Sequence, residues 1–160
     1  MRIWKFIHGT TKYQTFYSFS IRLTKVNPYE LKPQLIELLE SLGHEVENLG
    51  TDGPDSVDYP DHAHPLASSI EEGRNDLGIA ICGSGNGINI TLNKHKGIRS
   101  ALCWNEELAD LARQHNDANV VALPARFISD EIAKRIVQRF LTAEFEGGRH
   151  QRRVDKIACA

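Results

Sequence analysis

The sequence predicts an α/β protein, a three-layer Rossmann-like fold in which helices cover both faces of a parallel sheet. Short apolar runs alternate with segments whose apolar residues recur at helical spacing, the order typical of such sheets. The clearest run, Ile79–Ile81, leads directly into a glycine-rich turn and a helical pattern. Apolar residues make up 41% and charged residues 25% of the 160-residue chain, which is ordinary for one soluble globular domain.

We expect residues 1–27 to form an atypical N-terminal segment and residues 28–160 a single domain. The first 26 residues contain no acidic residue and hold six of the twelve aromatic residues in the chain. A secretory signal requires an uninterrupted apolar core, which this segment lacks. Within the segment, Ile21–Leu23 is the candidate for a short first strand.

The pattern becomes regular from residue 28 onward. Leucines between Leu31 and Leu42 recur at helical spacing, and Gly43 ends that helix. Val46–Leu49 is expected to form a strand, and residues 51–65, rich in Asp, Pro and Gly, a loop. The remaining expected elements are a helix over 66–72, strands over 79–81, 100–104 and 120–123, and helices from Ile88, from Glu106 and from Ser129.

Cys82 ends the central strand, and the next five residues read Gly-Ser-Gly-Asn-Gly. Glycines let a backbone approach a ligand closely, and free amides at a helix start attract anions. The spacing is neither the dinucleotide fingerprint nor a P-loop, since no lysine follows. A helix N-terminus also favours the thiolate of a neighbouring cysteine. We therefore expect a ligand site here, with a small buried core cysteine as the alternative interpretation.

The composition argues against several other classes of protein. The formal net charge of −2 gives no indication of a nucleic-acid surface. The three cysteines, Cys82, Cys103 and Cys159, form no C-x-x-C pair, so neither a disulfide framework nor a zinc site is indicated. A reducing, cytoplasmic location fits this cysteine usage best. No apolar run is long enough to span a membrane, so no membrane partner is expected.

A series of motifs between Tyr29 and Ile157 resembles the type B ribose-5-phosphate isomerase family, which includes galactose-6-phosphate isomerase subunits. The motifs are Asp58-Tyr-Pro, Cys82-Gly-Ser-Gly-Asn-Gly, Asn93-Lys, Gly97-Ile-Arg, Ala101-Leu-Cys-Trp, His115-Asn-Asp-Ala-Asn and Glu146-Gly-Gly-Arg-His-Gln-Arg-Arg. The resemblance implies aldose–ketose isomerisation of a phosphorylated sugar, most simply ribose 5-phosphate to ribulose 5-phosphate. It also implies no cofactor, no metal, and a homodimer or homotetramer whose site is shared between subunits.

The resemblance also assigns roles to residues. Cys82 matches the base that removes a proton beside the carbonyl, and Ser84 with the turn amides would hold the resulting enediolate. His115 matches the residue that helps to open the furanose ring. Arg149 and Arg153 match phosphate-binding arginines, whose guanidinium forks suit a phosphate dianion. The other predicted substrate-binding residues are Asp58, Tyr59, Gly83, Gly85, Asn86, Gly87, Asn116 and Arg126.

Two family features are absent from the sequence. Some members use a glutamate after the glycine turn as the base, but Ile88 stands there, which leaves Cys82 as the candidate. The family's Ser-Asp-His-Ala-Gly before an aromatic-x-Leu-Lys is replaced by residues 24–28, Thr-Lys-Val-Asn-Pro, although Tyr29-Glu-Leu-Lys is intact. In the family the Asp-His pair contacts sugar and phosphate, so we expect this 160-residue form to be poorly active.

Two other functions stay open on the sequence. One is a catalytically impaired, phosphosugar-binding homologue or subunit, which the missing Asp-His pair would permit. The other is a flavodoxin-like cofactor or nucleotide module, which the fold alone would allow. The sequence does not decide the preferred sugar, the choice between dimer and tetramer, or whether residues 1–27 are the natural N-terminus.

Overall fold

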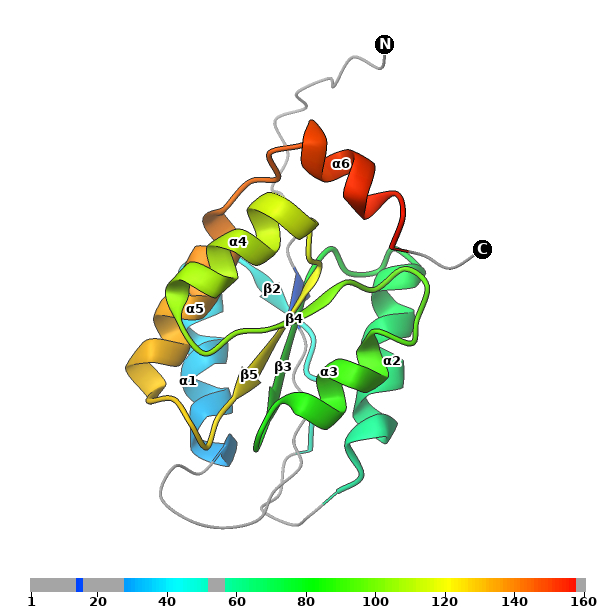
Figure 1. Cartoon of the computed structure of the whole chain (residues 1–160). Helices are drawn as coiled ribbons and strands as arrows, with labels where there is room; N and C mark the ends of the chain where they lie inside the picture. The colour runs from blue at the N-terminus through cyan, green and yellow to red at the C-terminus, as the bar shows by residue number, and fades with distance from the viewer. Residues whose placement is uncertain (1–13, 16–27, 52–56, 158–160) are drawn as a thin grey trace.

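The computed structural model describes residues 14–15, 28–51 and 57–157 (Figure 1). Its elements, in chain order, are β1 (Gln14–Thr15), α1 (Pro28–Ser41), β2 (Glu45–Val46), α2 (Tyr59–Glu71), β3 (Gly78–Cys82), α3 (Asn86–Leu92), β4 (Ser100–Leu102), α4 (Glu106–Asn116), β5 (Val120–Pro124), α5 (Asp130–Thr142) and α6 (Arg149–Val154).

The main sheet is parallel, with the strand order β3-β5-β4. Gly78 pairs with Val120 at one end of β3, and Cys82 pairs with Pro124 at the other. The amino ends of β3 and β5 therefore share one edge of the sheet, here called the amino edge, and their carboxyl ends share the carboxyl edge. A second parallel pair, β1 with β2, lies alongside, because β1 also contacts β3.

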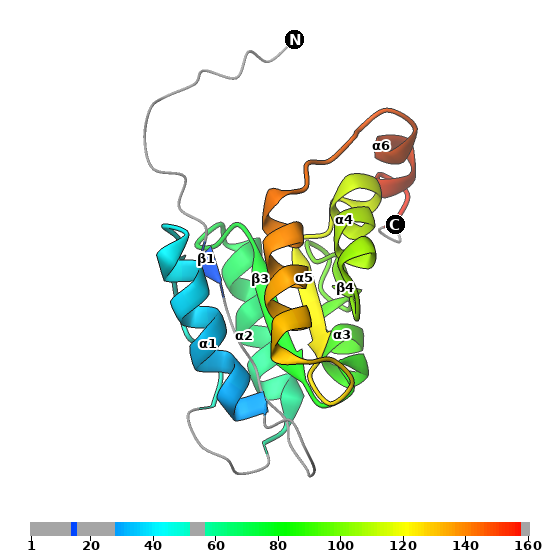
Figure 2. The ribbon, with the colours of Figure 1, turned by 90° about the vertical axis from the view of Figure 1, so that its left-hand side faces the viewer.

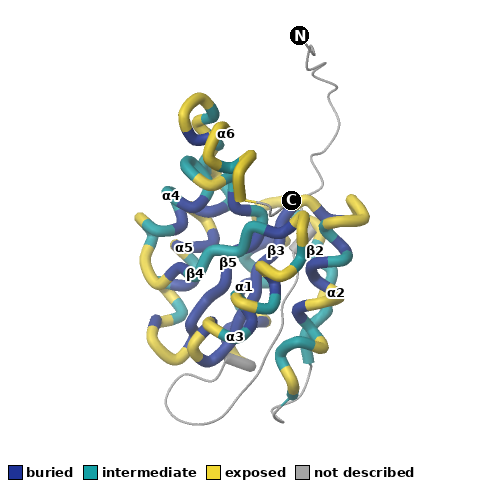
Figure 3. Tube along the Cα trace, turned by 45° about the vertical axis from the view of Figure 1, so that its right-hand side comes forward, coloured by how far each residue is buried: buried dark blue, intermediate teal, exposed yellow. Residues whose placement is uncertain are grey.

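Helices cover both faces of the sheet, as predicted: α1, α4 and α5 lie on one face, and α2 and α3 on the other (Figures 1 and 2). The side chains of β3 alternate between these two layers. Ile79 and Ile81 pack into the core that contains Phe140, whereas Ala80 and Cys82 pack into the core beneath α2 and α3. β3 and β5 are buried throughout and the outer helix faces are exposed (Figure 3). Burial on both faces explains why these strands read as uninterrupted apolar runs.

The predicted loop over residues 51–65 is wrong from residue 59 onward, since α2 begins at Tyr59. Pro60 occupies the first turn of the helix, where a missing N–H costs nothing. Pro65 lies inside the helix and removes one backbone hydrogen bond, but the adjacent buried face, which includes Leu66, offsets that loss. The density of prolines was therefore a misleading loop signal.

The predicted strand Val46–Leu49 is also wrong in its bounds, because β2 covers only Glu45–Val46. Beyond it the polar groups bond outside any sheet. The Asn48 side-chain oxygen accepts from the Gly50 amide at 3.0 Å, and the Leu49 carbonyl lies 2.8 Å from His62 Nδ1. The last predicted helix starts as expected, with the Ser129 hydroxyl accepting from the backbone of the first turn.

The N-terminal segment contributes β1, which the sequence did not predict at Gln14–Thr15. The predicted strand Ile21–Leu23 lies outside the described residues. Among the helices that the structure describes, none combines the length and the apolar character needed to cross a membrane.

Candidate active site

The glycine-rich turn joins β3 to α3 at the carboxyl edge, where ligands bind in open α/β sheets. Gly85 caps α3 with φ of +75°, a left-handed conformation that side-chain-bearing residues rarely adopt. A Cβ at Gly85 would also collide with the side chain of Leu102. The backbone of the turn is thus held by its neighbours in one conformation that depends on glycine.

Two predicted substrate-binding side chains lie against this turn. The Tyr59 ring, at the start of α2, lies so close that a Cβ on Gly87 would stand 2.6 Å from its Cζ. The guanidinium carbon of Arg126 would stand 3.0 Å from a Cβ on Gly83, and the Arg126 amide donates to the Gly83 carbonyl at 3.1 Å. Asp58, exposed, directly precedes α2. Gly87 and Gly83 therefore leave room beside the turn for the Tyr59 ring and the Arg126 guanidinium.

A cavity of about 470 Å³ opens beside the turn. Its walls come from the carboxyl ends of β4 and β5 and from the segments that follow β3, β4 and β5, namely Ser84, Asn86, Leu102, Trp104, Pro124 and Phe127. Trp104 and Phe127 are 54% and 73% exposed, which is unusual for such large apolar side chains. The sequence reasoning missed both residues as parts of a site. The available signal was the position of Trp104 at the carboxyl end of one predicted strand and of Phe127 a few residues beyond the next.

The two described cysteines lie in different core layers. Cys82 ends β3 next to the turn and is 5% exposed. Cys103 is 1% exposed, and burial raises the pKa of its thiol to about 12, so it stays protonated at neutral pH. Cys103 lies one residue beyond β4, so the prediction that it sits within a strand is wrong, although its amide still donates to the Ala122 carbonyl. Cys159 lies outside the described residues.

The remaining predicted residues lie at the amino edge. His115 and Asn116 end α4, just before β5, and Arg149 and Arg153 belong to α6, a helix that the sequence analysis did not predict. The Glu146 amide donates to the Gln114 carbonyl at 3.0 Å, which anchors the segment before α6 to the end of α4. Figures 1 and 2 show α6 at the end of the molecule opposite to the start of α3.

His150, in α6, contacts side chains of both helices in this amino-edge group, His115 of α4 and Arg149 of α6. Its ring stacks on that of His115, with centroids 4.1 Å apart and planes inclined by 5°. Arg149 Nε donates to His150 Nε2 at 3.2 Å. Burial lowers the pKa of His150, and the charges of His115 and Arg149 lower it further, so the neutral ring is favoured. His150 thus contacts both the predicted ring-opening histidine and a predicted phosphate ligand.

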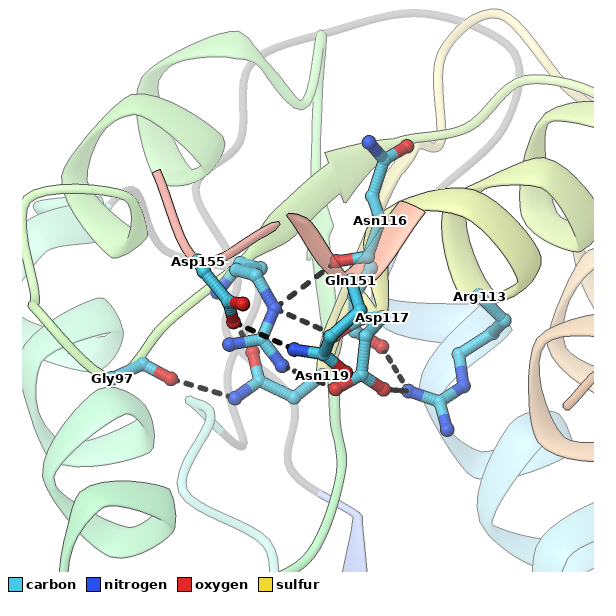
Figure 4. A network of polar contacts seen from close by, with 9 residues as sticks. Gly97, Arg113, Asn116, Asp117, Asn119, Gln151 and Asp155 are labelled. Atoms are coloured by element: carbon cyan, nitrogen blue, oxygen red, sulfur yellow. Dashed lines mark hydrogen bonds and ion pairs between the residues drawn. The ribbon is translucent and has the colours of Figure 1, made fainter. Parts of the chain in front are cut away.

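A polar network fixes the end of α4, where His115 and Asn116 lie (Figure 4). Asp117 adopts φ of +46° and forms ion pairs with Arg99 at 2.7 Å and Arg113 at 3.1 Å. Arg99 also donates to the Asn116 carbonyl, while Asn119 donates to the Gly97 carbonyl at 2.7 Å. The sequence reasoning did not assign these supporting roles, since they depend on residues brought together from separate loops.

Within one chain, the predicted site residues therefore form two groups. Tyr59, Cys82, the turn and Arg126 lie at the carboxyl edge, whereas the histidine and arginine group lies at the amino edge. β3 contains five residues, so the two edges are separated by about 13 Å at roughly 3.3 Å per residue.

The model of the Ribose/Galactose Isomerase family matches residues 26–157. The chain belongs to this family. The match spans both groups of predicted residues and confirms the resemblance inferred from the motifs. It begins just before Tyr29, where the sequence motifs also begin.

Individual isomerases of this family are similar to the chain over most of their length. A probable ribose-5-phosphate isomerase B of Mycoplasma pneumoniae is 48% identical over 129 residues, which cover 80% of this chain and 85% of the relative. Ribose-5-phosphate isomerase B of Escherichia coli is 45% identical over 127 residues, which cover 79% of this chain and 85% of the relative.

Solved structures agree with this assignment. The ribose 5-phosphate isomerase of Thermotoga maritima superposes with a TM-score of 0.84 at 42% identity, covering 91% of this chain and 97% of that one. The Mycoplasma genitalium enzyme, solved with bound ribulose-5-phosphate, superposes with a TM-score of 0.82 at 41% identity, covering 91% of this chain and 93% of that one. The predicted three-layer α/β fold is therefore confirmed, as is the prediction of a phosphosugar isomerase family.

Proposed function

We propose that this chain isomerises ribose 5-phosphate to ribulose 5-phosphate through an enediolate. The observation that carries the proposal is the position of Cys82 and the glycine turn, beside a cavity at the carboxyl edge, within the region that matches the isomerase family. Ribose 5-phosphate is the substrate class that the names of the similar enzymes support.

The chemistry requires a base and fixed hydrogen-bond donors. The Cys82 thiolate takes the proton from carbon 2 of the open-chain aldose, and the electron pair moves onto the carbonyl oxygen at carbon 1. The oxygen at carbon 1 gains a proton and the hydroxyl at carbon 2 gives one up, so that the carbonyl forms at carbon 2 as the Cys82 thiol returns its proton to carbon 1. No proton is gained or lost overall, and no oxidant or reductant is consumed. Ser84 and the amides of the turn stabilise the enediolate oxygens, and one such donor is typically worth about 3 kcal/mol.

The two groups of residues require two subunits in this proposal. Five carbons and an ester-linked phosphate span roughly 9 Å at bond lengths near 1.5 Å. That is shorter than the roughly 13 Å of backbone between the edges of the sheet, which favours a second chain as the source of His115. We propose that His115, Asn116, Arg149 and Arg153 of one copy complete the turn of another, in a homodimer or a homotetramer.

Replacement of the proposed base tests the mechanism. Cys82→Ala should lower the turnover number, measured as ribulose 5-phosphate formation, by about 100-fold or more. Cys103→Ala is the matched control, since that thiol is buried away from the turn and should leave turnover nearly unchanged. Near-native turnover in Cys82→Ala would remove Cys82 as the base, and turnover of other phosphosugars alone would remove ribose 5-phosphate as the substrate.

A second candidate function rests on the departure at residues 24–28, which lack the family's Asp-His pair. The chain would then bind phosphosugars with little turnover. Ribose 5-phosphate should raise its melting temperature, because a ligand of the folded state stabilises that state. Stabilisation without detectable product would favour this function over the isomerase.

A further inference from the structure

The helix α6 carries both arginines that match phosphate-binding residues, yet it has almost no apolar surface of its own. Its six residues read Arg-His-Gln-Arg-Arg-Val, and its buried residue is His150. A helix of this length is not stable in isolation, so contacts outside it hold it in place. The contacts of one buried histidine therefore bear on how Arg149 and Arg153 are held.

The nitrogen of His150 that faces Arg149 is an acceptor. An arginine side chain carries only donors, so the 3.2 Å contact from Arg149 Nε to His150 Nε2 requires an unprotonated Nε2. The proton of the neutral ring then lies on Nδ1. Arg149 is exposed, and among the described residues its guanidinium hydrogen-bonds to no other side chain. His150 is thus the contact that restrains this long, flexible side chain.

Glu146 is the alternative partner for the same ring nitrogen. Its Oε2 lies 3.5 Å from His150 Nε2 and 3.9 Å from His115 Nε2. A carboxylate and an unprotonated ring nitrogen are both acceptors, so no hydrogen bond joins Glu146 to His150 in this state. A proton on Nε2 would reverse the arrangement, because the ring would donate to Glu146 and lose Arg149. Protonation of one nitrogen therefore selects between two partners.

The surroundings of His150 favour the state that holds Arg149. Burial lowers the pKa of His150 most, and the charges of His115, Arg149 and Arg153 lower it further, while Glu146 raises it. These four groups come from α4, from the segment before α6 and from α6 itself. The neutral ring is therefore favoured, and with it the acceptor that Arg149 requires.

The face of the same ring supports His115, since the two rings stack with centroids 4.1 Å apart and planes inclined by 5°. We infer that His150 is a positioning residue, which restrains Arg149 through its Nε2 lone pair and His115 through its ring face. The inference rests on the proposed function, in which Arg149 binds the phosphate and His115 acts on the sugar. The hydrogen bond itself is independent of any activity.

Two variants separate the acceptor from the ring face. His150→Phe keeps a flat ring against His115 but has no acceptor, so the KM for ribose 5-phosphate should rise at least about threefold with kcat nearly retained. His150→Gln keeps an acceptor but has no ring, so kcat should fall with KM nearly retained. Arg152→Ala, a change to an exposed residue of the same helix, should have a smaller effect on both. The reverse pattern, or equal changes in both variants, would overturn the two roles.

A double-mutant cycle distinguishes positioning from damage to the fold. If His150 acts on KM through Arg149, His150→Phe should add nothing to the KM of Arg149→Ala. Additive effects on KM are expected if the substitution only disturbs the packing of α6. Additivity would therefore overturn the role of the acceptor.

The tautomer of His150 provides a readout that requires no substrate. In the full chain labelled with ¹⁵N-histidine, the NMR signals of His150 are identified by their absence in His150→Gln. At neutral pH, Nε2 should have the chemical shift of an unprotonated nitrogen. In Arg149→Ala the proton should move to Nε2, because Glu146 is the remaining partner, whereas Arg152→Ala should leave the tautomer unchanged.

The outcomes of the NMR measurement are distinct from those of the assay. A proton on Nε2 in the unmodified chain, or an unchanged tautomer in Arg149→Ala, would overturn the inference. The expected tautomers in a chain that forms no ribulose 5-phosphate would support the hydrogen bond and overturn the proposed function, so the two failures are distinguishable.

Discussion

Two inactive variants should restore each other's activity if the site is completed by a second copy of the chain. The variants are Cys82→Ala, which damages the carboxyl edge, and a double variant, Arg149→Ala with Arg153→Ala, which damages the amino edge. In a mixed dimer, one site receives both lesions. The other site receives intact Cys82 from one chain and intact arginines from its partner.

The expected recovery follows from the symmetry of a dimer. Equal mixing with free exchange gives about half mixed dimers, each with one intact site of two, so about 25% of wild-type activity returns. The parent variants should be far below this level. Loss of a positioned base costs about 100-fold, and loss of one charge-assisted phosphate contact costs about 1.5 to 3 kcal/mol, or roughly 10- to 150-fold in kcat/KM.

The assay is ribulose 5-phosphate formation at low substrate concentration, so that the rate follows kcat/KM. Co-expression with two different affinity tags, followed by purification on both, isolates the mixed species and should raise the recovery to about 50%. A mixture of Cys82→Ala with Cys82→Ser is the matched control, since both lesions lie at the same edge and no intact site forms. Failure of the purified mixed species to exceed its parents would refute the shared site.

Burial of Cys103 predicts a pH dependence of stability. Its pKa rises from 9.0 to about 12 in the folded state, so between these values the folded protein keeps a proton that the unfolded chain releases. This stabilisation is complete below pH 9 and falls as the pH rises, by about 2 kcal/mol at pH 10.5. In urea denaturation, the free energy of unfolding of Cys103→Ala should not show this decrease with pH. A decrease as large as in the unmodified chain would contradict the raised pKa of Cys103. Gly87→Ala places a Cβ 2.6 Å from Tyr59 and should cost about 1 to 3 kcal/mol of stability. Adding Tyr59→Ala should relieve that cost in a double-mutant cycle, and simple additivity would show that the ring is not the obstacle. Replacing residues 24–28 by Ser-Asp-His-Ala-Gly should raise turnover at least about tenfold, which requires about 1.4 kcal/mol; no gain would show that the departure is tolerated.

The elements that the sequence predicted well are those whose signals are local. β3 and β5 are buried on both faces, so their residues had to be apolar at every position. The turn after Cys82 depends on glycine for its left-handed cap and for close packing against Leu102, so its composition revealed its position. The Ser129 cap likewise depends on one side chain and the amides that immediately follow it.

The elements that the sequence did not predict depend on distant partners. Tyr59–Pro65 is helical because its buried face packs under the sheet, and that packing outweighs two prolines. α6 contains few apolar residues to mark it, and its place is fixed by the stacking of His150 on His115. Trp104 and Phe127 meet at one cavity only because β4 and β5 pair in parallel.

The division of the predicted site between two edges could not be inferred from motif order alone. His115 lies in the last turn of the helix that precedes β5, whereas Arg126 follows the same strand, so the five buried residues of β5 lie between them. A strand of that length carries the chain from one edge of the sheet to the other. Residues close in sequence therefore lie at opposite ends of one subunit. If a single sugar meets both groups, as we propose, the fold of one chain favours an enzyme that works as an assembly.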